Sequence, residues 1–490
     1  MANWPKAPII YEINTWVWLA ELSRKHKRTI TLGNVPEKEW DAIGAFGFDA
    51  VWLMGVWERS PMGIAISQKN QGLLEDFRRA LPDFKTEDNV GSPYCIRRYD
   101  ADPRLGGPAG LKVARTELAK RNLKLVLDFV PNHLAPDSPM TKEHPEYFVQ
   151  GSDEDLKHDP ASFIKVGNNV LACGRDPYFP AWPDVVQINA FDTELRRRAI
   201  AKLSSIAEQA DGVRCDMAML MMNSIFEKTW GRLAGQRPPA DYWPQVIGAV
   251  NRAHPEFIFI AEAYWDLEWE LMQQGFDFCY DKKLYDRMEH DNAESVRSHL
   301  CADMEYQNRL VRFLENHDEP RAAATFSPEK ERAAAVAIAT LPGIALFHEG
   351  QFEGRKVRLP VFLGRRPSEP ANKQLSSFYA KLLKTVREEQ VRSGEWHLCE
   401  VSGWEGNTSF PNIIAWCYDR AGKRHAVVIN FSESGASGRI HFPWDNLKGR
   451  SCKLTDLLSG TTYDRSGDEI QNEGLYVDLP GWGYHLFRIS

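Results

Sequence analysis

The feature that most restricts the fold of this 490-residue chain is a series of eight short, continuous apolar runs. Each run is followed by a polar loop and then by a stretch with the apolar spacing of an amphipathic helix. Strands that are apolar along their whole length are typical of parallel sheets, in which both faces are covered. The runs that we predict to be strands begin at Ile9, Phe48, Leu123, Gly212, Phe257, Phe276, Leu310 and Gly343.

The number of strand–helix units favours a closed barrel over an open sheet. Eight units over about 350 residues fit an α/β fold of the TIM (β/α)8 barrel type with insertions. A doubly wound open sheet is the alternative, but no G-x-G-x-x-G motif follows the first run. The helical stretches that begin at Thr193 and Ser327 are also predicted to open with capping boxes.

The sequence pattern changes near Glu395, where short strand-like runs separated by turn signals replace the strand–helix alternation. This spacing is typical of an all-β sandwich. We therefore predict a barrel domain over residues 1–390, a small inserted domain at 134–186 after the third strand, and an antiparallel β-sandwich at 391–490. A second long connection, residues 59–93, is a candidate lid or subunit contact.

Charge and composition restrict the environment of the protein. The net charge of −7 argues against a nucleic-acid partner. No apolar stretch approaches the roughly 18 residues of a membrane span, and the N-terminus lacks the basic start and apolar run of a secretory signal. The eight scattered cysteines form no C-x-x-C pair and are expected to be reduced. We expect a cytoplasmic protein without a membrane partner, and a homo-oligomer is compatible with the sequence.

Carboxylates follow the apolar runs at strand after strand. Asp128, Asp216, Glu262 and Asp318 each stand within or just after such a run. A single Asp in this place is most often a helix N-cap, but four successive cases indicate a shared site at the carboxyl ends of the strands. Converging carboxylates serve either to bind a divalent metal ion or to catalyse glycosyl transfer.

Four motifs resolve this choice. LDFVPNH, GVRCD, AEAYW and ENHD occur in this order, at the third, fourth, fifth and seventh predicted strands. Together they resemble the signature regions of the α-amylase family of retaining α-glycoside hydrolases and transglycosylases. The stretch LPGIALFHEGQ is similar to the eighth strand of that family.

The resemblance implies a role for each matching residue. Asp216 matches the nucleophile, Glu262 the general acid/base, and Asp318 the carboxylate that holds sugar hydroxyls. The apolar surroundings of Glu262 would favour its protonated form by desolvation. In the retaining mechanism the nucleophile and the acid/base stand about 5 to 5.5 Å apart. The resemblance also implies substrate-binding roles for Tyr94, His133, Arg214 and His317.

The sequence departs from the family pattern at two places. Met219 and Leu220 occupy positions where many amylases carry a lysine and a histidine, which puts typical starch endo-amylase activity in doubt. Only Asn132 and Asp184 match the common ligands of the family's calcium site, whereas calcium generally takes six to eight oxygens. We therefore expect no required metal or cofactor, with a structural calcium ion as the alternative.

The sequence leaves three candidate functions. The first is a hydrolase that cleaves α-glucosidic, and specifically α-1,4, linkages of malto-oligosaccharides or related α-glucans by double displacement through a covalent glycosyl-enzyme. The second is an α-glucan transglycosylase, such as a glucanotransferase or maltosyltransferase. The third is a non-catalytic glycan-binding homologue, which is disfavoured because Asp216, Glu262 and Asp318 are all present.

Overall fold

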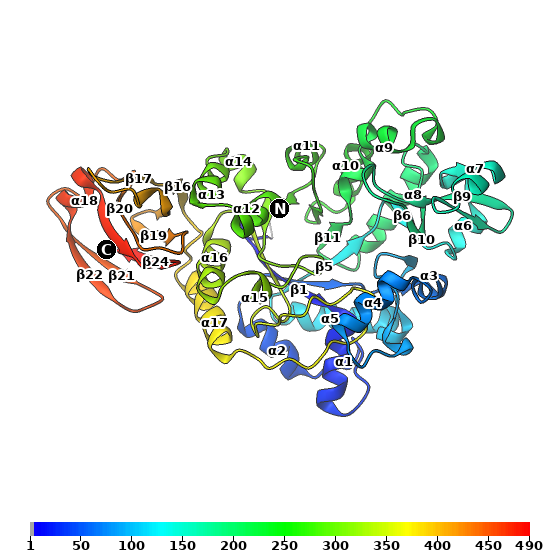
Figure 1. Ribbon diagram of the computed structural model, residues 1–490, viewed down its shortest axis with the longest axis horizontal. Helices are drawn as coiled ribbons and strands as arrows, with labels where there is room; N and C mark the ends of the chain where they lie inside the picture. Colours follow the sequence, from blue (N-terminus) through cyan, green and yellow to red (C-terminus); the bar gives the residue numbers. More distant parts are fainter. Residues whose placement is uncertain (1–3) are drawn as a thin grey trace. The chain divides into compact units, whose positions relative to one another are not determined.

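The predicted barrel is present in the computed structural model, which describes residues 4–490 (Figure 1). Each barrel strand begins within the apolar run that predicted it, and β2, β12 and β15 are buried along their whole length. The TIM-barrel prediction is therefore confirmed. The eight strands are β1 (Ile9–Asn14), β2 (Ala50–Met54), β5 (Lys124–Phe129), β11 (Gly212–Cys215), β12 (Ile258–Ala261), β13 (Phe278–Tyr280), β14 (Leu310–Arg312) and β15 (Ile344–His348).

The described chain divides into two compact units, which we treat separately. The first comprises Trp4, residues 10–280 and the short segment 357–368, and the second comprises residues 5–9, 281–356 and 369–490. The predicted boundary between residues 390 and 391 falls between the last long helix and the first strand of the C-terminal sheets. That boundary stays a prediction.

In the first unit, β2, β5, β11 and β12 are successive neighbours in parallel register. Amphipathic helices follow the strands because their apolar faces bury against the sheet. The predicted capping box at Thr193 is wrong, because the side chain of the preceding Asp192 accepts from the Leu195 amide and caps the helix. The long helices of this unit are α1 (Thr15–His26), α2 (Glu37–Ala45), α5 (Gly107–Ala119), α8 (Thr193–Ala207) and α10 (Tyr242–Ala253).

The predicted insertion after the third barrel strand contains an antiparallel sheet (cyan in Figure 1), and its bounds at residues 134 and 186 stay a prediction. Its strands pair in the order β6-β10-β9-β7, and β8 also pairs with β9. Two short helices, α6 (Pro139–Glu143) and α7 (Asp153–His158), complete it. The strands are β6 (His133–Leu134), β7 (Gln150–Gly151), β8 (Phe163–Val166), β9 (Asn169–Gly174) and β10 (Trp182–Gln187).

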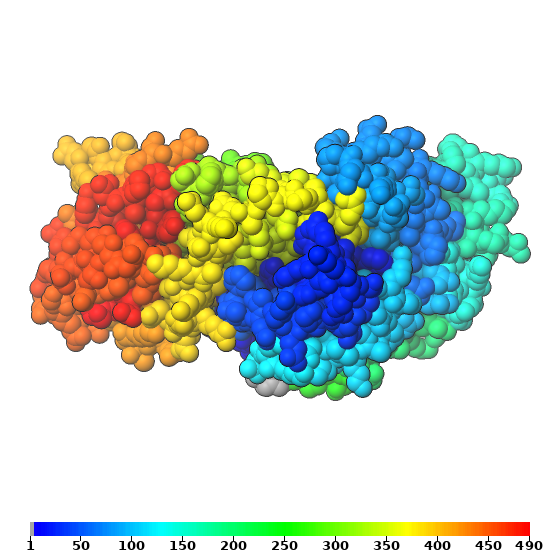
Figure 2. Space-filling model, turned by 90° about the horizontal axis from the view of Figure 1, so that it is seen from below, coloured from blue at the N-terminus to red at the C-terminus, as the bar shows by residue number. Residues whose placement is uncertain are grey.

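The connection predicted at residues 59–93 folds onto the segment 357–368. It carries α3 (Pro61–Ser67) and α4 (Gln71–Ala80), which lie at the surface (mid-blue in Figure 2). Buried Leu363 packs with Phe77 of α4, and the Arg365 guanidinium pairs with the Asp88 carboxylate at 2.6 Å. The connection is therefore held by a segment distant in sequence, and its proposed roles as a lid or subunit contact stay predictions.

In the second unit, β14 and β15 pair in parallel. The helix predicted from Ser327 is confirmed, but its capping box is not complete: the Ser327 side chain accepts from the Lys330 amide, and a lysine stands where a box needs Glu or Gln. Within residues 4–490 no helix is both long and apolar enough to span a membrane. The longer helices of this unit are α12 (Lys282–His290), α13 (Ala293–Leu300), α16 (Pro328–Thr340) and α17 (Lys373–Glu388).

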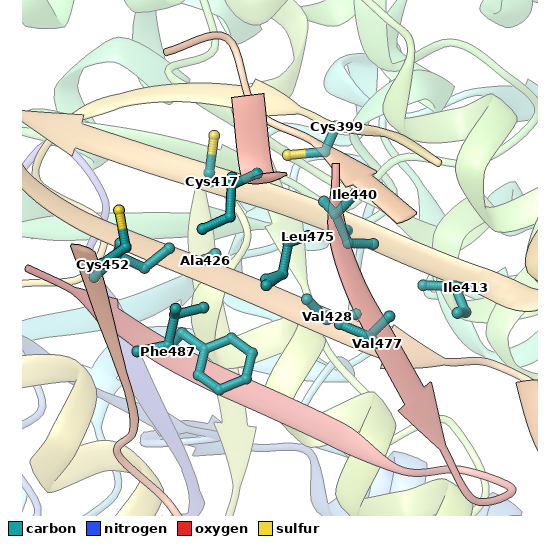
Figure 3. Close-up of a cluster of buried hydrophobic side chains, with 14 of the residues drawn as sticks. Cys399, Ile413, Cys417, Ala426, Val428, Ile440, Cys452, Leu475, Val477 and Phe487 are labelled. Carbon is teal, nitrogen blue, oxygen red and sulfur yellow. The ribbon is translucent and has the colours of Figure 1, made fainter. Parts of the chain in front are cut away.

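The C-terminal residues form the predicted antiparallel sandwich. Side chains of both sheets, among them Val428, Ile440 and Val477, bury one core between them (Figure 3). All eight cysteines are free thiols, and only Cys301 is exposed. One sheet has the order β16 (Glu395–Leu398), β18 (Ile413–Arg420), β19 (Lys423–Asn430), β24 (Tyr484–Ile489), β21 (Ser451–Asp456) and β22 (Thr462–Ser466), and the other has the order β17 (Glu400–Ser402), β20 (Ala436–His441) and β23 (Leu475–Leu479).

Candidate active site

Two carboxylates leave neighbouring barrel strands at the same level. β11 ends at Cys215 and β12 at Ala261, and these two residues are paired in the parallel register. Asp216 and Glu262 are therefore the first residues beyond the ends of adjacent strands. Backbone hydrogen bonds continue one step further, because the Asp216 amide donates to Phe129 at 2.8 Å and the Glu262 amide to Cys215 at 3.0 Å. Both side chains are buried.

The guanidinium of Arg214 joins the two carboxylates. Its Nη1 lies 2.6 Å from Oδ1 of Asp216 and its Nη2 lies 2.9 Å from Oε2 of Glu262. Burial by itself lowers the pKa of Arg214, but the negative charges of Glu262 and Asp216 and the tyrosines around it outweigh burial and raise that pKa. The arginine is therefore a fixed cation between two acids in a water-poor site.

Glu262 receives two further hydrogen bonds. The Met217 amide donates to its Oε2 at 2.6 Å, and the Tyr264 hydroxyl lies 3.1 Å from its Oε1. Met217 itself adopts a left-handed conformation with φ of 42°. Each of these donors favours the charged carboxylate, whereas burial favours the protonated acid. Tyr264 is not among the predicted site residues, although it stands two residues after Glu262 in the same AEAYW motif.

Asp128 lies on β5, beside the arginine-bearing strand, and is bound on both oxygens. It accepts from the Trp52 indole at 3.2 Å and from the Gly55 amide at 3.0 Å. Its register partner on β11 is Arg214. This geometry suits a supporting carboxylate.

Tyr94 and His133 lie in the same compact unit as the two acids. The ring centroid of Tyr94 is 5.2 Å from the guanidinium carbon of Arg214. Burial lowers the pKa of His133 to about 4, so its imidazole is neutral near pH 7. The imidazole contacts the Trp182 ring edge-on, with centroids 5.3 Å apart, and its Nδ1 lies 3.3 Å from the Asn132 amide nitrogen.

The remaining predicted residues, His317 and Asp318, follow β14 and belong to the second unit. His317 Nε2 lies 2.9 Å from Oδ2 of Asp318. The histidine side chain is 2% exposed and that of Asp318 is 45% exposed, so the carboxylate is accessible to solvent. The Asn316 side chain accepts from the Asp318 amide at 2.9 Å and fixes this turn.

The first acid of the ENHD motif, Glu315, is bonded within the fold. Glu315 is fully buried, and its Oε1 lies 2.7 Å from the Arg321 guanidinium while its Oε2 accepts from the Ala322 amide. Arg321 also reaches Nδ1 of His348 at 2.5 Å. The sequence analysis did not single out this cluster, because Arg321 follows β14 and His348 ends β15.

The calcium site implied by the resemblance does not fit the residues present. The Asn132 side-chain oxygen accepts from Nε2 of Gln187 at 2.8 Å. Desolvation raises the pKa of Asp184 to about 6, whereas a calcium ligand must be ionised. Within residues 4–490 no group of three or more His, Cys, Asp or Glu side chains is placed to hold a metal ion.

The two departures at Met219 and Leu220 are accommodated by burial. Both residues lie in a short 3-10 turn at Ala218–Met221, and both side chains are buried. Apolar residues here pack inward, so this turn presents neither an amine nor an imidazole to a sugar.

The chain matches no protein-family profile. It is 22% identical over 478 residues to the alpha-amylase MalA of Haloarcula japonica, covering 95% of this chain and 60% of that protein. It is 22% identical over 465 residues to the alpha-1,4-glucan:maltose-1-phosphate maltosyltransferase of Picrophilus torridus, covering 89% of this chain and 65% of that one. The chain thus spans less than two thirds of the length of these two relatives.

Solved structures with the same fold include a noncanonic maltogenic alpha-amylase, AmyB, from Thermotoga neapolitana. The TM-score is 0.71 and the identity 21%, over 98% of both chains. An alpha-amylase from Lactobacillus plantarum gives a TM-score of 0.67 at 20% identity, over 99% of both chains. The ordered motifs, the barrel and the relatives agree: in sequence this chain is similar to α-amylases and a maltosyltransferase, and it has the fold of solved α-amylases.

Proposed function

We propose that this protein is a retaining α-glycoside hydrolase. Its substrates would be malto-oligosaccharides or related α-glucans, cleaved at α-1,4 linkages. The observation that carries the proposal is the Arg214 guanidinium, which contacts Asp216 at 2.6 Å and Glu262 at 2.9 Å. One guanidinium that binds both carboxylates keeps them close together, and retention requires a short separation of about 5 to 5.5 Å.

In the first proposed step, a carboxylate oxygen of Asp216 attacks the anomeric carbon. The bond from that carbon to the glycosidic oxygen breaks, and Glu262 gives its proton to the departing oxygen. Arg214 keeps Asp216 ionised and therefore nucleophilic. The product is a glycosyl ester on Asp216 and a free shorter sugar.

In the second step, Glu262 takes a proton from a water molecule as the water oxygen attacks the anomeric carbon. The ester bond to Asp216 breaks, and the carboxylate returns to its pairing with Arg214. Two inversions at one carbon give net retention of the α configuration.

Four further residues would bind the sugar. Tyr94 supplies an aromatic ring beside the Arg214 cation. His133, neutral near pH 7, can donate a hydrogen bond to a hydroxyl without adding charge. The resemblance also assigns sugar-hydroxyl binding to Asp318 and the adjoining His317, a role that favours ring distortion toward the transition state.

These steps use side chains alone, so we propose that no metal or cofactor is required. The eight free thiols support action in a reducing compartment such as the cytoplasm. The net charge of −7 supports the absence of a nucleic-acid partner.

Transfer to a second sugar is the alternative outcome of the same intermediate. Two observations favour transfer as a second candidate function. Several curated relatives are named maltosyltransferases. In addition, buried Met219 and Leu220 stand after the proposed nucleophile, where many amylases carry a lysine and a histidine. The acceptor, water or sugar, decides between hydrolysis and transfer.

The test is product analysis over time with maltose to maltoheptaose, by mass spectrometry for length and by NMR for the anomeric configuration. Wild-type protein should release shorter sugars that are initially α, and Asp216→Asn should release none. The matched control is Asp76→Asn, an exposed carboxylate on α4, which should behave like wild type.

Products longer than the donor would establish transfer in place of hydrolysis. Products that are initially β would contradict retention. Binding of maltoheptaose without any product would favour the glycan-binding homologue.

A further inference from the structure

A second cavity lies in the first unit, away from the two carboxylates. Its volume is about 440 Å³, within the range typical of small-molecule sites. Residues of β4 (Ile96–Ala101), β5, α6 and α8 line it, and neither Asp216 nor Glu262 is among them. We call it the α8 pocket.

Basic side chains dominate the charged lining of this pocket. Arg97, Arg98, Arg198 and Lys202 are cationic, and Asp100 is the one carboxylate among the lining residues. The whole chain carries a net charge of −7, so this concentration of positive charge is a local feature.

Carboxylates of the protein neutralise these cations unequally. Arg97 pairs with Glu58 at 2.5 Å and lies 4.0 Å from Asp137, and Arg98 reaches Glu58 only at 3.7 Å. The Arg198 guanidinium contacts the His144 imidazole at 2.8 Å and the Tyr147 hydroxyl at 3.3 Å, and its charge also acts on the Glu146 carboxylate, whose pKa is lowered. Lys202 stands over the Tyr99 ring, 5.9 Å from its centroid.

The inner wall is apolar and rigid. The Tyr99 hydroxyl lies 3.0 Å from the Val130 carbonyl oxygen and accepts from the Val130 amide at 2.8 Å, which fixes the ring against the end of β5. The Tyr99 and Phe129 rings lie 5.7 Å apart and form one aromatic surface. The other apolar lining residues include Leu134, Met140, Ile188 and Leu195.

Cationic and aromatic side chains that line one pocket favour a molecule with an anionic group and a flat body. Arginine guanidinium groups match the oxygens of a phosphate in a bidentate manner, and a lining with four cations and one carboxylate suits an anion. Rings of sugars and aromatics both pack on aromatic side chains. We infer that the α8 pocket binds a small phosphate ester whose body is a single ring.

The α8 pocket takes no part in the proposed hydrolysis, but it is lined by barrel residues that contact the residues of the proposed active site. Phe129, whose side chain lines the pocket, accepts a hydrogen bond from the Asp216 amide through its carbonyl oxygen. The lining residues Pro131 and Leu134 flank His133. A ligand in this pocket therefore contacts the segment that carries part of the sugar site.

The test is isothermal titration calorimetry of the full chain with phenyl phosphate. Methyl phosphate, which lacks the ring, and phenol, which lacks the charge, serve as ligand controls. We expect saturable one-to-one binding of phenyl phosphate. The double variant Arg198→Gln/Lys202→Gln should weaken it by about tenfold or more, since each lost charge-assisted hydrogen bond is worth at least about one decade in Kd.

The matched protein control is Arg197→Gln, on the same helix but outside the pocket and already paired with Glu194. It should leave Kd within about twofold. Equal weakening in Arg197→Gln would mean general charge attraction and would overturn the inference, as would the absence of saturable binding to wild type.

A second variant keeps the charges and removes the space. Ala199 lines the pocket from α8, and Ala199→Trp should abolish binding of phenyl phosphate. Unchanged affinity in Ala199→Trp, with the circular dichroism of the wild type, would overturn the inference. Titration with glucose 6-phosphate then distinguishes a sugar ring from an aromatic ring as the body of the ligand. Tighter binding than that of phenyl phosphate indicates a sugar phosphate, and weaker binding indicates an aromatic phosphate.

Discussion

Arg214 stabilises the negative charge of two acids whose proposed roles need opposite protonation states in the first step. Arg214 stabilises the negative charge of Asp216, which suits a nucleophile, and also that of Glu262, which must carry a proton in the first step. The two carboxylates therefore share one cation.

Replacing this arginine should impair both folding and catalysis. Arg214→Met leaves two buried carboxylates without their cation, which is expected to cost about 3–5 kcal/mol of unfolding free energy. Urea denaturation measures the loss, and hydrolysis of a chromogenic maltoside measures the accompanying fall in kcat. Arg197→Met, at an exposed site, is the matched control and should change neither. A fully active, stable Arg214→Met protein would contradict the shared-cation interpretation.

The buried histidine predicts a pH dependence of stability. His133 has a pKa of about 4 in the folded protein, against about 6.5 for an unfolded histidine. Between these values the unfolded chain binds more protons, so the contribution of His133 to stability is present above pH 6.5 and is lost as pH falls toward 4. The loss is about 1.4 kcal/mol per pH unit, roughly 3 kcal/mol in total.

Urea unfolding at pH 7 and pH 4.5 checks this contribution, with His133→Gln as the non-titrating reference. Wild type should lose more stability between the two pH values than the variant does. Equal losses would mean that the imidazole is not desolvated in the folded protein.

The sequence could reveal those site residues that stand next to a recognisable local pattern, and not the others. Asp216 and Glu262 directly follow apolar runs, so their convergence was predictable from the barrel alone. The donation from Met217 to Glu262 was not predictable, because it joins a backbone amide after β11 to a side chain after β12, and no residue type marks such a donor. The Glu315–Arg321–His348 cluster was also hidden, since its members come from two strand ends.

At the scale of elements, strands buried on both faces were easier to predict than short ones. All eight barrel runs were predicted because continuous apolar sequence marks such strands. β7 (two residues) and β17 (three residues) carry no periodic signal of that kind. Helix starts were displaced for a local reason: Asp192 competes with Thr193 as the cap, and only the structure shows which oxygen reaches the Leu195 amide.

The cap of α8 gives a sharp test of this correction. Asp192→Ala removes the acceptor for the Leu195 amide and should cost about 1 kcal/mol. Thr193→Ala, one residue later and exposed, should leave stability unchanged or raise it by a few tenths of a kcal/mol, since alanine is the better helix former. Equilibrium denaturation of the two variants measures both values, and the reverse order would restore the capping box.

The inserted sheet gives a prediction about metal ions. Because Asn132 is bonded to Gln187 and Asp184 favours its neutral form, chelation with EGTA should leave the melting temperature unchanged. Differential scanning calorimetry before and after dialysis, with calcium added back, measures this. A rise in melting temperature with calcium concentration would indicate a bound ion, since a ligand of the native state stabilises it by mass action.

At the scale of the whole molecule, the short segment 357–368 packs against residues that lie far from it in the sequence. Leu363 is fully buried against Phe77, so Leu363→Ala should cost about 2–5 kcal/mol. Hydrogen exchange should quicken at the amides of α4 more than elsewhere in the first unit. The control is Ser368→Ala, an exposed residue of the same segment, and uniform acceleration in both variants would contradict the local role of Leu363.

The pairing of Arg365 with Asp88 also has a consequence for synthesis. The partners are separated by 277 residues, so a ribosome that adds roughly 5–20 residues per second needs about 15 to 55 seconds between them. Throughout that interval the apolar side of α4 has emerged and its partner does not yet exist. The nascent chain must therefore keep this surface from other proteins until the segment that covers it has been synthesised.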